Sequence, residues 1–148
     1  MRLTLAAINA SYVHTNLAVR LIASRVIEGW ECRVFERHVN LPRRDILRDL
    51  MRTGPDAVGF STYIWNRDMV LALGAAVKRA APGVFVYFGG PEAANDPEAF
   101  LNCGDAVCAG EGEASVGPLL RGLEAGDLRY VPGLITREFA NPQAEPLP

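Results

Sequence analysis

The sequence lacks any apolar run close to the ~20 residues that a membrane-spanning helix needs. Residues 1–5 also lack the long apolar stretch and cleavage site of a signal peptide. Positive charge is not in excess either, since the net charge is −2, which argues against the basic surface of a nucleic-acid-binding protein. We therefore expect a cytoplasmic protein that is soluble, crosses no membrane and binds no nucleic acid.

Cysteine is scarce, and the signatures of several common sites are missing. Cys32, Cys103 and Cys108 are odd in number and have no metal-ligand spacing, so we interpret them as buried free thiols. The sequence contains no glycine-rich dinucleotide fingerprint after its first apolar run, no P-loop and no nucleophile elbow. It also lacks the acidic cluster of a phospho-receiver domain and a histidine–carboxylate cluster. Spacing alone predicts a ligand-binding module without a catalytic set of its own.

What is present is enough for one folded α/β domain. The chain has 148 residues, of which 49% are hydrophobic and 22% charged, so it can bury a core. Short apolar runs alternate with helical patterns that end at glycine or proline, which predicts five strands joined by helices. The expected strands cover residues 3–8, 31–37, 57–60, 84–88 and 105–109. Residues 130–136 are expected to form a small terminal strand or hairpin arm.

Alternating strands and helices indicate a parallel sheet with right-handed crossovers. We predict a three-layer, flavodoxin-like five-stranded sheet of order 2-1-3-4-5 with helices on both faces, because there are only five units. The folded domain is expected over residues 1–136. Residues 137–148, which are rich in proline and poor in apolar side chains, are expected to be a linker.

Ligands of open α/β sheets bind at the carboxyl ends of the strands, and polar residues follow the third expected strand directly. Ser61 and Thr62 end this strand, where they donate either to a ring nitrogen or ribose of a ligand or to local backbone. Tyr63 and Trp65 wall a pocket for a flat ligand or pack in the core. Asn66 is expected to cap the helix that follows.

Two glycine-containing turns are expected at the same edge of the sheet. Gly89-Gly90-Pro91 either lets a ligand approach the backbone or forms a simple turn. Gly110-Glu111-Gly112 places backbone N–H groups at a helix start, which favours an anion or a polar ligand edge. The alternative is that the acidic residues there only stabilise the helix.

The first loop supplies the remaining candidates, which are Asn9, Ser11, Tyr12 and His14. A lone histidine in a loop is more often a capping or packing residue than a metal ligand. On the residues alone, His14 is therefore a weak candidate for binding a metal.

Four blocks together resemble a known family: residues 9–18, 59–66, 89–92 and 110–113. They look like the N-terminal cobalamin-binding domain of cobalamin-dependent radical S-adenosylmethionine enzymes, and the likeness extends to about residue 136. In such proteins a proline-rich linker leads to a barrel with a C-x-x-x-C-x-x-C iron–sulfur motif. The resemblance thus implies a missing C-terminal radical S-adenosylmethionine domain of the same polypeptide, with S-adenosylmethionine and a 4Fe-4S cluster as further cofactors.

The resemblance also implies roles for the candidates. Cobalamin would be held base-off and extended, with its corrin over the carboxyl edge of the sheet and its nucleotide tail beside the strands. Ser61 or Thr62 would contact the tail, and Gly89-Gly90 would leave space for it. The first loop, with Asn9, Tyr12 and His14, would approach the lower face of the corrin.

The first loop departs from the D-x-H-x-x-G motif of cobalamin-binding mutases and methionine synthases, whose histidine binds cobalt. Here His14 lies three residues beyond Ser11 and no glycine follows in the loop, so cobalt ligation by His14 is open. The alternative function is an interaction or sensing module on the same fold, with Tyr12, Tyr63 or Trp65 filling the pocket. A free-standing flavodoxin-like carrier is a weaker third alternative.

Overall fold

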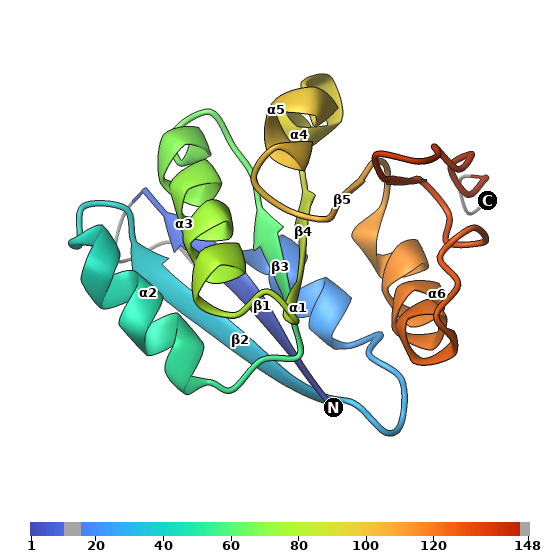
Figure 1. The fold of residues 1–148 in the computed structure, drawn as a ribbon, viewed down its shortest axis with the longest axis horizontal. Coiled ribbons are helices and arrows are strands. Elements are labelled where there is room, and N and C mark those ends of the chain that lie inside the picture. Colours follow the sequence, from blue (N-terminus) through green and yellow to red (C-terminus); the bar gives the residue numbers. More distant parts are fainter. Residues whose placement is uncertain (11–15, 146–148) are drawn as a thin grey trace.

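The computed structural model describes residues 1–10 and 16–145, and the first-loop candidates Ser11, Tyr12 and His14 lie outside the described residues. Six strands and six helices are found in the described part of the chain (Figure 1). In chain order they are β1 (Arg2–Asn9), α1 (Leu17–Ala23), β2 (Glu31–His38), α2 (Arg43–Arg52), β3 (Ala57–Ser61), α3 (Arg67–Ala80), β4 (Phe85–Gly89), α4 (Pro91–Asn95), α5 (Pro97–Leu101), β5 (Ala106–Cys108), α6 (Gly112–Ala125) and β6 (Leu134–Ile135).

The strands form one sheet of order β2-β1-β3-β4-β5-β6. The first five are parallel, which confirms the predicted order 2-1-3-4-5. The prediction of five strands was one short, because β6 pairs antiparallel with β5 inside the segment expected to form a small strand or hairpin arm. This strand extends the sheet beyond β5, which has only three residues of its own.

Helices cover both faces of the sheet, as predicted. Side chains of α2, α3 and α5 pack with one set of alternating strand residues, and those of α1 and α6 pack with the other set. In Figure 1, α2 and α3 lie in front of the sheet and α1 lies behind it. The strand β3 is buried along its whole length, as expected for a parallel strand covered on both faces.

Two helices have features that the sequence pattern did not reveal. In α1 the side chains of Leu17 and Leu21 are 67% and 47% exposed, whereas Val19 is 1% exposed. The segment carries apolar residues on two stripes, so periodicity alone did not separate them. The short helix α4 was not predicted, and it begins with Pro91, where the missing N–H is not needed.

Residues beyond 136 return alongside β6. Ile135 forms an antiparallel bridge with Ala140, and the Asn141 side-chain amide donates to the carbonyls of Leu128 and Val131, at 2.9 Å each. The backbone N–H of Gly133 donates to the carbonyl of Pro142 at 2.9 Å. The role of residues 137–148 as a linker to another domain stays a prediction. Among the helices of the described residues, none has both the length and the apolar character needed to cross a bilayer.

Candidate functional site

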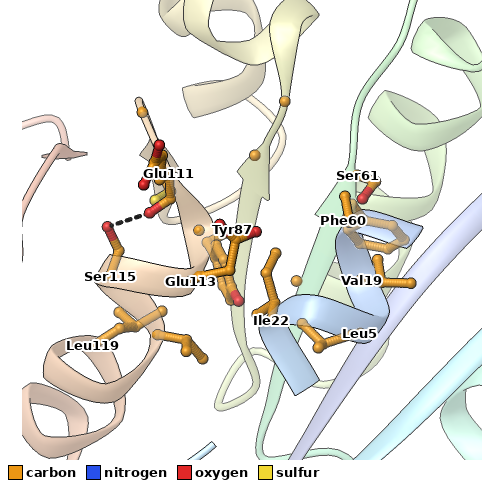
Figure 2. Close-up of a pocket in the computed structure, with 18 of the residues that line it drawn as sticks. Leu5, Val19, Ile22, Phe60, Ser61, Tyr87, Glu111, Glu113, Ser115 and Leu119 are labelled. Carbon is orange, nitrogen blue, oxygen red and sulfur yellow. Dashed lines mark hydrogen bonds between the residues drawn. The ribbon is translucent and has the colours of Figure 1, made fainter. Parts of the chain in front are cut away.

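A cavity of about 330 Å³ opens at the carboxyl ends of β3, β4 and β5, between α1 and α6 (Figure 2). Its walls are mostly apolar, because α1 and α6 turn aliphatic side chains toward the sheet at this point. The apolar lining includes Leu5, Val19, Ile22, Val116, Leu119, Val131 and Leu134. Eight of the residues singled out from the sequence also line it: Ser61, Tyr63, Gly89, Gly90, Pro91, Gly110, Glu111 and Gly112.

Ser61 and Thr62 have different surroundings, although the sequence did not separate them. The Thr62 hydroxyl donates to the Gly89 carbonyl at 2.7 Å and accepts from the Ala93 N–H at 3.0 Å, so it ties β3 to β4 and α4. Ser61 lines the cavity, and within the described residues its hydroxyl has no hydrogen-bond partner. Among the described residues, Ser61 therefore supplies the hydroxyl of this pair that is available to a ligand.

The two glycines after β4 also differ. A Cβ added at Gly90 would lie 2.6 Å from the Thr62 carbonyl oxygen, and the φ angle there is +101°, so the turn itself requires glycine. A Cβ added at Gly89 would meet only the Cys108 carbonyl, at 3.9 Å. The missing side chain of Gly89 thus leaves free space in the cavity, while Gly90 is needed for close backbone packing.

The start of α6 forms one side of the cavity mouth. A Cβ added at Gly112 would lie 2.6 Å from Ile22 Cδ1, so glycine allows α1 and α6 to approach each other here. The Ser115 hydroxyl is 3.3 Å from the Glu111 carbonyl and 2.7 Å from that of Pro132 (Figure 2). Glu111 and Glu113 also line the cavity, near the N–H groups of the helix start.

Two aromatic residues form a stacked pair next to the cavity. The rings of Tyr63 and Trp65 are 4.5 Å apart between centroids and nearly parallel, at 3°. Tyr63 lines the cavity, whereas Trp65 is 51% exposed and does not line it. The pair thus presents a flat aromatic surface at the rim instead of filling the pocket.

The predicted capping role of Asn66 was wrong. No side-chain hydrogen bond of Asn66 caps α3, and the residue is 1% exposed. Its amide donates to the carbonyls of Ile8 and Ser61, at 3.0 and 3.1 Å, and its oxygen accepts from the Tyr63 N–H at 2.8 Å. Asn66 therefore joins the ends of β1 and β3, which fixes the loop that carries Tyr63.

Of the first-loop candidates, only Asn9 lies within the described residues. Asn9 ends β1 at the same edge of the sheet, but it does not line the cavity. Asn16 caps α1, where its side chain accepts from the Val19 N–H at 3.2 Å. Within the described residues no group of three His, Cys, Asp or Glu side chains is placed to hold a metal ion. Cobalt ligation by His14 stays a prediction.

Sequence reasoning missed Tyr87 and Cys108, which also line the cavity. Tyr87 is the cross-strand neighbour of Gly59 and lies two residues before Gly89, on the same face of the sheet. Because side chains alternate along a strand, the sequence could have placed Tyr87 on the same face as Gly89. Burial raises the pKa of the Cys108 thiol, which therefore stays neutral in the cavity wall at neutral pH.

A second cavity, of about 440 Å³, lies near the amino ends of β4 and β5. Two of its three acidic lining residues are in ion pairs: Asp105 pairs with Lys78 at 2.9 Å, and Asp127 with Arg129 at 2.9 Å. This cavity also lies at the end of the sheet where open α/β folds do not bind ligands. The cavity at the carboxyl edge is therefore the candidate site.

Two methyltransferases are similar in sequence to part of this chain. A carbapenam methyltransferase of Streptantibioticus cattleyicolor, 2-(S-pantetheinyl)-carbapenam-3-carboxylate methyltransferase, is 33% identical over 90 residues, covering 57% of this chain and 13% of that protein. The cobalamin-dependent radical SAM methyltransferase TokK of Streptomyces tokunonensis is 32% identical over 103 residues, covering 64% and 15%. The chain thus spans only a small part of the length of these relatives.

Solved structures share the fold. The cobalamin-dependent S-adenosylmethionine radical enzyme OxsB, with aqua-cobalamin and S-adenosylmethionine bound, matches with a TM-score of 0.82 and 16% identity, covering 97% of this chain and 22% of that one. The radical S-adenosylmethionine methyltransferase TsrM of Kitasatospora setae matches with a TM-score of 0.75 and 21% identity, covering 98% and 30%.

The B12 binding domain model matches residues 3–120, which include every strand of the parallel sheet and most of α6. The match also includes the glycine-lined carboxyl edge and most of the cavity lining. This chain therefore belongs to the B12 binding domain family, with relatives among the cobalamin-dependent radical S-adenosylmethionine methyltransferases.

Proposed function

We propose that this domain holds cobalamin base-off and extended, with the nucleotide tail in the cavity between α1 and α6 and the corrin over the carboxyl edge. The observation that carries the proposal is the cavity itself, which is open beside Gly89 and mostly apolar in its walls. It is also lined by Ser61, whose hydroxyl has no hydrogen-bond partner among the described residues. Few polar groups in a largely apolar pocket are typical of a site for a small organic ligand.

The size of the cavity supports this division of the cofactor. A volume of about 330 Å³ suits a heterocyclic base with part of its ribose, whereas a corrin ring is too large for it. The corrin would therefore lie outside, across the ends of the strands. A base that enters the cavity leaves the cobalt, so tail insertion and the base-off form go together.

The residues of the rim have matching roles in the proposal. Ser61 contacts the tail as it passes β3, and the space beside Gly89 admits it. The carboxylates of Glu111 and Glu113 accept hydrogen bonds from the amide groups that surround a corrin. The flat Tyr63–Trp65 pair supports the ring from the side, and Asn9, Tyr12 and His14 are expected to approach its lower face.

The full-length protein is proposed to be a radical S-adenosylmethionine enzyme. The named relatives, of which this chain spans 13% and 15%, support a missing C-terminal domain with a 4Fe-4S cluster and S-adenosylmethionine. Bound cobalamin would supply methyl transfer or electron mediation to that domain. This chain would bind and orient the cofactor, and a location in the cytoplasm stays a prediction.

The alternative function, an interaction module that no longer binds cobalamin, predicts a pocket filled by the protein's own aromatic side chains. The cavity is open beside Gly89 and Gly90, and Trp65 lies outside it with half of its surface exposed. Both observations support the cofactor-binding proposal.

Titration of the purified chain with hydroxocobalamin tests the proposal. We expect uptake of one equivalent and a change of the absorption spectrum to that of the base-off form. Absence of uptake at micromolar concentrations by equilibrium dialysis would favour the interaction module. Uptake with an unchanged base-on spectrum would contradict tail insertion.

A further inference from the structure

Tyr87 lines the cavity and is largely buried, with its ring lying over the neighbouring strand β3. It belongs to β4, and its ring lies over Gly59 of β3, where an added Cβ would be 2.5 Å from Tyr87 Cζ and 2.6 Å from its hydroxyl oxygen. Only glycine at position 59 permits this arrangement. Figure 2 shows Tyr87 between the α1 side chain of Ile22 and the α6 side chains of Glu113 and Ser115.

The hydroxyl of Tyr87 is a polar atom in a cavity whose walls are mostly apolar. The side chain is 6% exposed, and within the described residues its oxygen makes no hydrogen bond. Among the described residues, every side-chain nitrogen or oxygen that is sealed from solvent has a hydrogen-bond partner. The Tyr87 hydroxyl, which has none, is therefore not sealed, and it is reached from the cavity that Tyr87 lines. A buried hydroxyl without a partner is unfavourable, and a ligand that supplies one gains affinity.

The hydroxyl is available as a hydrogen-bond donor. Burial raises the pKa of Tyr87, so the phenol stays protonated at neutral and moderately alkaline pH. The neighbouring thiol of Cys108 is also neutral, since burial raises its pKa. A neutral donor at this depth is complementary to a neutral acceptor on an aromatic ring, such as a heterocyclic nitrogen.

We propose that Tyr87 is a specificity residue whose hydroxyl donates to a nitrogen of the heterocyclic base at the end of the cofactor tail. This inference rests on the proposed function. In a base-off cobamide the ring nitrogen that would bind cobalt is free to accept a hydrogen bond. The site would therefore prefer tails that end in benzimidazole or purine over tails that end in a phenol, which has no ring nitrogen.

The first test compares Tyr87→Phe with the unchanged chain for three probes: hydroxocobalamin, cobinamide, which has no tail base, and p-cresolylcobamide, whose base has no nitrogen. We expect Tyr87→Phe to weaken hydroxocobalamin binding about three- to tenfold, as for one lost hydrogen bond, and to leave the other two within about twofold. Tyr130→Phe, which changes a hydroxyl on an 82% exposed residue, is the matched control.

The outcomes separate this inference from the proposed function. If the unchanged chain takes up none of the probes, both are wrong. If it binds hydroxocobalamin and Tyr87→Phe binds it equally well, or loses affinity for all three probes alike, only the role of Tyr87 is overturned. That role is likewise overturned if the unchanged chain binds cobinamide as tightly as hydroxocobalamin.

A second measurement needs no ligand. Because the hydroxyl has no partner within the described residues, Tyr87→Phe should unfold in urea at the same midpoint as the unchanged chain or at a higher one. A clearly lower midpoint would mean that the hydroxyl serves the fold, and the inference would then be overturned.

Discussion

At the scale of single residues, neighbours in the sequence have separate tasks at the carboxyl edge. Thr62 is 0% exposed and its hydroxyl is used twice within the protein, whereas the hydroxyl of Ser61 points to no partner among the described residues. Gly90 is required by its turn, whereas Gly89 leaves space. The edge thus combines residues that hold its shape with residues that stay available for a ligand.

This division predicts opposite effects for two hydroxyl deletions. Thr62→Val leaves the Ala93 N–H without its partner, whereas the Gly89 carbonyl keeps the hydrogen bond from the Thr62 backbone N–H at 2.7 Å. The loss should lower the free energy of unfolding by about 1–3 kcal/mol. Ser61→Ala should change it by less than about 0.5 kcal/mol. Urea denaturation of both variants measures these values.

For cobalamin affinity we expect the larger effect from Ser61→Ala and the smaller one from Thr62→Val. Ser61→Ala is expected to weaken binding about three- to tenfold, through the loss of one hydrogen bond to the tail. A stability loss in Ser61→Ala as large as that in Thr62→Val would show that Ser61 has an internal partner, contrary to this account.

The error at Asn66 shows what a local pattern leaves out. Asparagine before a helix is a good capping signal, but the carbonyl of Ile8, 58 residues away in sequence, receives its amide instead. That contact exists only once β1 and β3 are adjacent. The position of Tyr87 over Gly59 depends in the same way on the pairing of β3 with β4.

At the scale of elements, β6 and the residues after it are fixed by a close approach at Gly133. Its φ angle is +71°, and a Cβ added there would lie 1.9 Å from the Ala109 carbonyl oxygen. The Ala109 N–H donates to the Gly133 carbonyl at 2.8 Å, so the approach is part of the β5–β6 pairing. The return segment depends on this glycine.

Gly133→Ala is therefore expected to lower the free energy of unfolding by more than about 2 kcal/mol, since both the left-handed conformation and the backbone contact are lost. Gly83→Ala is the control, because no atom lies within 4 Å of an added Cβ and its φ angle is not positive. We expect it to stay within about 0.5 kcal/mol of the unchanged chain. Equal stability of the two variants in urea would contradict the close approach.

A second link between elements is ionic. Arg67, at the start of α3, pairs with Glu92 of α4 at 3.1 Å and with Asp96, before α5, at 2.6 Å. The hydrogen bond from Arg67 is the main reason why the pKa of Asp96 is lowered. A lowered pKa means that Asp96 stabilises the fold above about pH 4, and that this contribution is lost as the pH falls through the lowered value.

The measurement is an NMR titration of the Asp96 carboxyl group. In the unchanged chain Asp96 should titrate below the usual range, and in Arg67→Met its pKa should move up toward the ordinary value for aspartate. The Asp96 pKa should also depend less on salt concentration in the variant, because salt screens the partly exposed ion pair of the unchanged chain. An Asp96 pKa that is the same in both proteins would contradict the pairing.

At the scale of the whole molecule, the sheet order and the edge that carries the site could be predicted from the sequence. Alternating strands and helices leave few topologies, and parallel strands place their carboxyl ends together. The antiparallel β6 and the path of residues 137–145 beside it were harder to predict, because a strand of two residues leaves little periodic signal in the sequence. The depth of the cavity follows from how closely α1 and α6 pack, which Gly112 and Ile22 decide.

The central claim is that the space beside Gly89 receives the tail of a base-off cobalamin. Gly89→Val puts a branched side chain into that space, while Gly83→Val puts the same side chain before the other end of β4, where no atom lies within 4 Å of an added Cβ. Both variants should keep the fold, as circular dichroism would verify. The two variants thus carry the same added side chain, one inside the proposed site and one outside it.

The decisive measurement is the dissociation constant of hydroxocobalamin for these two variants and the unchanged chain, by absorbance titration. The account predicts at least tenfold weaker binding to Gly89→Val and binding to Gly83→Val within about twofold of the unchanged chain, tenfold being about 1.4 kcal/mol. Full affinity of a folded Gly89→Val for hydroxocobalamin would contradict it.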